Sequence, residues 1–155
     1  MRFSSLESLL TRHPAPSFVA PLALAREVVR QLQHEDARAL VIESDAPPVR
    51  IVSDRHVVDA LMAARRDADA LTALDLSVPI ESFDGSTTLE MAWSRIRTNH
   101  RPWVAIRRGN RVIALLSRTQ VLEWIVLAQE DEVDCAIGAV QCFSLANRRP
   151  SRAHE

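Results

Sequence analysis

Two serines occupy matching places in the chain, each at the junction between an apolar run and an amphipathic segment, and are candidates for contact with a ligand. Ser53 and Ser117 end such runs, and Arg55 and Arg118 lie within the next two residues. The free N–H groups and the dipole at a helix start attract anions, and a cation there is unfavourable unless it meets one. The pattern predicts that a phosphate-bearing ligand binds at these helix starts.

The same residues also have a purely structural interpretation. Ser117 with Gln120 three positions on forms a capping box, in which each residue satisfies the backbone of the other. Ser53 is an ordinary N-cap for a helix that begins with Asp54, whose charge suits the helix dipole. The sequence leaves both interpretations open.

Enzymatic and metal chemistry have no residues to carry them. The five histidines show neither HxxxH nor HExxH spacing, and Cys135 and Cys142 are too far apart for a redox CxxC pair. No glycine-rich phosphate loop and no GxSxG motif occur. We therefore expect a protein that is not an enzyme and that holds neither a metal nor a resident cofactor.

Length, composition and charge indicate a small globular protein. The 155 residues, 47% hydrophobic and 25% charged, suit one domain or two small halves with a shared core. A net charge of −1 argues against nucleic-acid binding. No stretch approaches the roughly 18 apolar residues of a membrane span, and the opening residues lack the apolar core of a signal peptide. We expect a cytoplasmic protein without membrane contact.

The segments that must position the two serines recur along the chain. Ser117 lies 64 residues after Ser53, and apolar residues pair at the same offset without a gap. These pairs are Val28 with Ala92, Leu32 with Ile96, Leu40 with Val104, Ile42 with Ile106, Val49 with Ile113, Val57 with Val121, and Leu61 with Ile125. Such self-similarity indicates two copies of one structural unit.

Each copy predicts the element order β-α-β-β-α. An extended segment precedes an amphipathic helix with apolar residues every three or four positions, and two short apolar runs and a second amphipathic helix follow. The expected strands are 17–19, 38–43 and 49–52, then 81–83, 103–107 and 111–116, and the expected second helices are 54–64 and 118–128. In the second copy, Thr87 with Glu90 predicts a capping box at the first helix.

A single unit would leave one face of its three-stranded sheet uncovered, whereas two units that face each other would cover both. The expected fold is therefore α+β, with two β-α-β-β-α repeats related by pseudo-twofold symmetry and packed as one module. The expected divisions are an N-terminal helix (1–14), the first repeat (15–64), a linker that ends in a helix (65–78), the second repeat (79–128) and a C-terminal tail (129–155).

This pattern resembles the tandem CBS (cystathionine-β-synthase) domain pair, or Bateman module, from about Pro16 to Ala128. Residues 50–56 (RIVSDRH) are similar to the family's strand-end motif of Gly, two apolar residues, Ser or Thr, and Asp three positions later. Residues 84–89 (DGSTTL) are similar to its turn into the first helix. The resemblance implies a regulatory protein that binds adenosine-containing ligands in a cleft between the repeats.

The resemblance also assigns site residues by position. One half-site takes Ser53, Arg55, His56 and the backbone near Arg38 and Leu40, and the other takes Ser117, Arg118, Gln120 and the backbone near Trp103. Two departures from the family pattern matter. His56 and Gln120 replace its ribose-binding Asp, and Arg50 and Ala114 replace its Gly. A carboxylate contributes about 1.5–3 kcal/mol for each ribose hydroxyl it accepts, whereas a neutral side chain accepts one bond at most.

Two functions therefore stay open. The first is a sensor of an adenine nucleotide (AMP, ADP or ATP), of S-adenosylmethionine or of a related phosphate ligand, which signals to an effector protein. The second is a ligand-free dimerisation or scaffolding module that has lost nucleotide binding. In either case the resemblance implies a homodimer formed through the helices that carry Leu61, Met62, Leu122 and Ile125.

Overall fold

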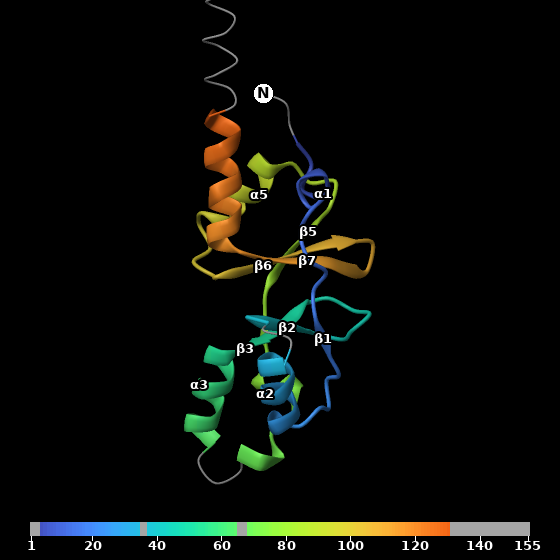
Figure 1. Ribbon diagram of the computed structural model, residues 1–155, viewed down its shortest axis with the longest axis vertical. Coiled ribbons are helices and arrows are strands. Elements are labelled where there is room, and N and C mark those ends of the chain that lie inside the picture. The colour runs from blue at the N-terminus through green and yellow to red at the C-terminus, as the bar shows by residue number, and fades with distance from the viewer. Residues whose placement is uncertain (1–3, 35–36, 65–67, 131–155) are drawn as a thin grey trace, which may run out of the picture.

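Two β-sheets face each other across the middle of the molecule, and helices cover their outer faces (Figure 1). This computed structural model describes residues 4–34, 37–64 and 68–130. The first repeat contains β1 (Phe18–Val19), α2 (Ala25–His34), β2 (Ala39–Ile42), β3 (Arg50–Ser53) and α3 (Asp54–Ala64). The second contains β5 (Glu81–Asp84), α5 (Leu89–Ile96), β6 (Trp103–Arg108), β7 (Arg111–Ser117) and a helix over residues 118–130. The predicted β-α-β-β-α order is confirmed in both copies.

Strand pairing follows the same pattern in the two repeats. β1 runs parallel to β2 and β5 parallel to β6, while each of the hairpins β2–β3 and β6–β7 is antiparallel. Leu40 pairs with Val52 in the first hairpin, and Val104 pairs with Leu116 in the second, so the 64-residue offset holds in the register. Gly109, at a φ of 60°, and Asn110 form the turn between β6 and β7.

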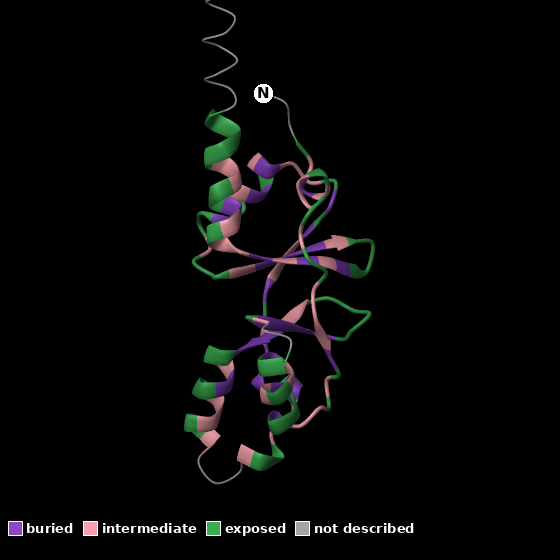
Figure 2. Cartoon of the chain, in the orientation of Figure 1, coloured by how far each residue is buried: buried purple, intermediate pink, exposed green. Residues whose placement is uncertain are grey.

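The strands β2 and β6, one in each sheet, are buried on both faces along most of their length (Figure 2). On the outer face of the first sheet, Leu40 and Val52 pack against α2 and α3. On the inner face, Val41 and Ile51 belong to a cluster with Ala105 of the second sheet. We call this the inter-sheet cluster, whose buried members are Ala39, Val41, Ile51, Ile80, Ala105 and Val112. Burial on both faces explains why the strands are continuous apolar runs instead of alternating ones.

Each repeat is completed by a short helix from the connector that precedes the other repeat. α1 (Leu6–Leu9) places Leu6 in the core of the second repeat, and α4 (Ala73–Leu76) places Leu76 in the core of the first. The N–H of Leu6 donates to the Thr87 carbonyl at 2.9 Å, and the N–H of Ala73 donates to the Ala23 carbonyl at 2.7 Å. The pseudo-twofold relation therefore includes the connectors.

Some details of the fold differ from the sequence-based expectation, and one expected segment lies largely outside the described residues. β4 (Val78–Pro79) pairs with β3 and makes the first sheet four-stranded, and a 3-10 turn, η1 (Ala68–Ala70), precedes α4. The N-cap of α5 is Thr88, whose hydroxyl accepts from the Met91 N–H at 3.3 Å, so the capping box predicted at Thr87 is wrong. Most of the tail predicted over 129–155, with both cysteines, lies outside the described residues.

Candidate functional site

At the helix start after β3, the backbone and hydroxyl of Ser53 both contact the side chain of His56. Ser53 is buried at the end of β3, where it pairs with Ala39 of β2. Its backbone N–H donates to Nδ1 of His56 at 3.1 Å, and its hydroxyl oxygen lies 3.1 Å from the same nitrogen. His56, at the position of the family's ribose-binding Asp, therefore caps the helix through a nitrogen that carries no proton.

The helix start at Ser117 repeats this arrangement with different atoms. The Ser117 N–H donates to Oε1 of Gln120 at 2.8 Å, and the Gln120 N–H donates to the Ser117 hydroxyl at 3.2 Å. The capping box predicted for this pair is confirmed. A ligand hydroxyl at this position would compete with the backbone for the Gln120 oxygen.

The environment of His56 favours the neutral ring. Burial lowers the pKa of His56 below the ordinary histidine value of 6.5, while Asp59 acts in the opposite direction and Arg55 adds to the lowering. Below pH 6.5 the unfolded chain then binds more protons at this residue than the folded chain does. The stabilisation that neutral His56 gives to the folded protein is therefore fully present above pH 6.5. It is lost as the pH falls through the lowered pKa of this residue.

We expect the free energy of unfolding to decrease when the pH falls from about 8 to about 5, because protonated Nδ1 cannot accept the Ser53 N–H. Urea unfolding followed by circular dichroism at several pH values measures this decrease. His56→Gln is the control, since an amide oxygen takes the same position in the second repeat, and it should show a smaller decrease. If the free energy of unfolding decreased equally with pH in the wild type and in His56→Gln, the capping role of neutral His56 would be contradicted.

The two arginines predicted to attract a phosphate lie in different environments. The Arg55 side chain is 89% exposed and lies 3.9 Å from the Asp59 carboxylate. Arg118 lies over the ring of Trp93, 6.0 Å from its centroid, and donates to the Asn99 carbonyl at 3.4 Å. The Arg118 guanidinium is therefore held in place beside its helix start, whereas Arg55 extends into solvent.

The remaining predicted site residues lie in, or next to, the strands β2, β3 and β6. Arg38 is exposed, while the Leu40 side chain is fully buried in the core of the first repeat. Trp103 pairs with Ser117 in the sheet and packs, half-buried, against the inter-sheet cluster. At the family's Gly position, Arg50 donates from Nε to the Ser77 hydroxyl at 2.8 Å, and so ties β3 to the linker.

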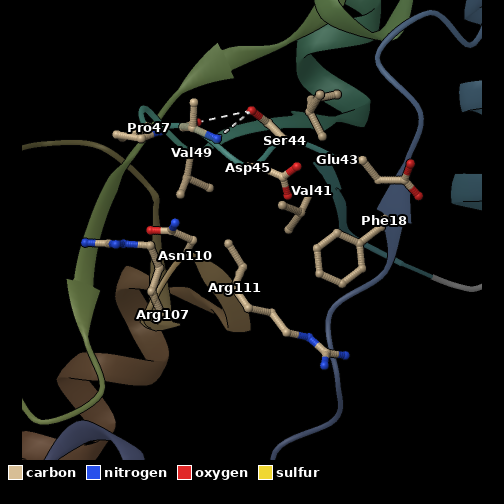
Figure 3. Close-up of a pocket in the computed structure, with 13 residues that line it drawn as sticks. Phe18, Val41, Glu43, Ser44, Asp45, Pro47, Val49, Arg107, Asn110 and Arg111 are labelled. Carbon is tan, nitrogen blue, oxygen red and sulfur yellow. Dashed lines mark hydrogen bonds between the residues drawn. The ribbon is translucent and has the colours of Figure 1, made fainter.

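A cavity that sequence reasoning missed lies between the two hairpins (Figure 3). It measures about 350 Å³ and is lined by residues of the β2–β3 loop, by Phe18 and by residues of the β6–β7 turn. Ser53 and Ser117 lie at the opposite ends of β3 and β7. The acidic residues of the loop, Glu43 and Asp45, were the signal in the sequence, but only the fold shows that they line one cavity with Arg107 and Arg111.

Neither a metal centre nor a membrane span is found in the part of the chain that the structure describes. No group of three or more His, Cys, Asp or Glu side chains among the described residues is arranged to hold a metal ion. Within the same ranges, the helices are too short or too polar to cross a bilayer.

Known structures share this fold at low sequence identity. A CBS-domain-containing protein from Agrobacterium tumefaciens is 16% identical, with a TM-score of 0.62 over 77% of this chain and 96% of that chain. A hexameric CBS-CP12 protein from bloom-forming cyanobacteria is 14% identical, with a TM-score of 0.65 over 97% and 88%. CBSX2 in complex with AMP is 17% identical, with a TM-score of 0.61 over 81% and 98%. No family model and no curated protein matches the sequence.

These observations define a class of tandem α+β module, in which two equivalent repeats share a core between facing sheets. More particularly, the chain has the fold of a CBS-domain pair, or Bateman module. The resemblance drawn from the repeated motif is confirmed at the level of the fold.

Proposed function

We propose that this chain is a non-enzymatic regulatory module that binds an adenine nucleotide or a related phosphate ligand and transmits the change to an effector protein in the cytoplasm. The observation that carries the proposal is the presence of two equivalent helix starts, which follow Ser53 in β3 and Ser117 in β7. The two helices begin at the same side of the facing sheets (Figure 1). The likeness to CBSX2, a structure in complex with AMP, supports the choice of ligand.

Arg118 is the residue best placed to meet a phosphate. Its guanidinium is held near a helix start by Trp93 and Asn99, so little side-chain freedom is lost when an anion binds. Arg55 could provide the equivalent charge in the first repeat by leaving Asp59, because an exposed pair at 3.9 Å costs little to break. With neutral His56 and Gln120 in place of carboxylates, we expect micromolar and not tighter binding.

Calorimetric titration with AMP, ADP, ATP and S-adenosylmethionine tests the proposal. We expect at least one to bind, and we expect His56→Asp or Gln120→Asp to strengthen binding about tenfold or more by restoring a charged acceptor for the ribose. Gln33→Asp is the matched control, because it adds the same charge at an exposed position of α2. If none of the four compounds bound to the wild type or to either Asp variant, the proposal of nucleotide sensing would be overturned.

A scaffolding function is the second candidate, and the outer surface of the helices favours it. Both predicted ligand positions are used as helix caps. Much of α3 and of the helix over residues 118–130 is exposed (Figure 2), and the exposed residues include apolar ones. These side chains are Val58, Met62, Leu122, Val126 and Leu127. Of the four residues predicted for a dimer face, Met62 and Leu122 are exposed, but Leu61 and Ile125 pack against the two cores.

A further inference from the structure

The cavity between the hairpins joins the two repeats at the side away from the serines. Its walls come from the loop over residues 43–49 in the first repeat and from Arg107 and residues 110–112 in the second. Its volume of about 350 Å³ lies within the range of about 300–1,000 Å³ that is usual for small-molecule sites. A molecule bound here would contact both repeats at once.

The base of the cavity is apolar. Phe18, Val41, Val49 and Val112 line it, and all four belong to or pack against the inter-sheet cluster. In Figure 3 the Phe18 ring and Val41 border one side of the hollow, and Val49 borders another. Such a surface is suited to an aliphatic or aromatic group of modest size.

The rim of the cavity carries charges of both signs. Glu43 and Asp45 flank Ser44, whose hydroxyl donates to the Ala46 carbonyl at 3.1 Å and accepts the Ala46 N–H at 3.2 Å, which orders this part of the loop. Arg111 lies across the hollow on β7 (Figure 3). Among the described residues, no ion pair or hydrogen bond engages the side chains of Glu43, Asp45 or Arg111.

The fourth charge on the rim is already engaged. Arg107 donates from Nε to the Ser82 hydroxyl at 2.9 Å and from its terminal nitrogen to the Gly109 carbonyl at 3.0 Å. The rim therefore carries one guanidinium and two carboxylates that have no partner among the described residues. A nucleotide phosphate, with up to two negative charges, would be repelled by Glu43 and Asp45, whereas a molecule with one charge of each sign would not.

We propose that this cavity binds a free α-amino acid with an apolar side chain. The ligand carboxylate pairs with Arg111, its ammonium group pairs with Asp45 or Glu43, and its side chain packs on Phe18 and Val41. Because the cation comes from the second repeat and the anions from the first, binding draws the two hairpins together. This inference rests on the proposed regulatory function, to which it adds a second ligand class at a separate site.

Calorimetric titration with L-leucine tests the inference, with 4-methylpentanoate and 3-methylbutylamine as probes that each lack one charge. We expect L-leucine to bind and each single-charge analogue to bind about tenfold more weakly or worse. Arg111→Gln and Asp45→Asn should each weaken L-leucine binding by a similar factor. No binding of L-leucine, or equal binding of the amine or the acid, would overturn the proposal.

Matched controls separate this site from the nucleotide site. Arg30→Gln and Asp69→Asn remove the same charges at exposed positions outside the cavity and should leave L-leucine binding unchanged. Arg111→Gln should leave nucleotide titrations unchanged, and Gln120→Asp should leave L-leucine titrations unchanged. Loss of L-leucine binding in Arg30→Gln or Asp69→Asn, or a change in it with Gln120→Asp, would contradict the assignment, whatever the nucleotides do.

Discussion

Replacing Ile51 with Ala is expected to lower the free energy of unfolding by about 2–5 kcal/mol, through lost apolar transfer and the cavity that remains. Ile51 is fully buried in the inter-sheet cluster, where it contributes to the packing of both sheets. Small domains are stable by only about 5–15 kcal/mol in total, so a large part of the stability is at stake. Urea unfolding measures the loss.

The tryptophans make this experiment a test of the shared core. All three, Trp93, Trp103 and Trp124, lie in the second repeat, whereas Ile51 lies in the first. If the sheets unfold as one unit, the fluorescence midpoint falls together with the circular-dichroism midpoint. A fluorescence midpoint that stays in place would show that the repeats unfold separately. Val58→Ala, 53% exposed on α3, is the control and should change stability by less than about 0.5 kcal/mol.

Leu6→Ala is expected to destabilise the protein by about 2–5 kcal/mol as well, although it lies in a four-residue helix near one end of the described chain. Its side chain is buried in the core of the second repeat, together with Phe83 and Leu116. Thermal unfolding followed by tryptophan fluorescence measures the effect, because Trp93 and Trp124 pack against the same core.

Leu22→Ala is the matched control for Leu6→Ala. Leu22 is 76% exposed in the segment before α2, so removing the same atoms exposes no core and should change stability by less than about 0.5 kcal/mol. An equally small effect of Leu6→Ala would mean that α1 does not dock on the second repeat in solution.

Repetition made most of the fold predictable from the sequence. The offset between Ser53 and Ser117 aligned two weak patterns, and the strands and helices lie within a few residues of their expected bounds, as with α3 (Asp54–Ala64). The face-to-face packing followed from the physical argument that a three-stranded sheet needs cover on both sides. The capping box at Ser117 was predictable because it depends on residues only three positions apart.

Features set by distant contacts were not predictable in this way. The pairing of β4 with β3 depends on where the linker returns, and the cavity depends on two loops whose sequences share no pattern. The choice of Thr88 over Thr87 as the N-cap depends on where the strand β5 and its turn end. The assigned roles of Ser53, His56, Arg55 and Arg118 as ligand contacts stay predictions, since the hydrogen bonds and charge contacts of these side chains are made within the protein.

Because α1 packs on the second repeat and α4 on the first, the connector helices affect the order in which the protein folds. Leu6 leaves the ribosome well before its neighbours Phe83 and Leu116, which follow much later in the chain. Contacts between residues so far apart in the chain form late, because a long loop must close before they form. We expect α4 to pack on the first repeat well before the second repeat is available to α1, so that α1, although it is made before both repeats, docks after the first repeat is complete.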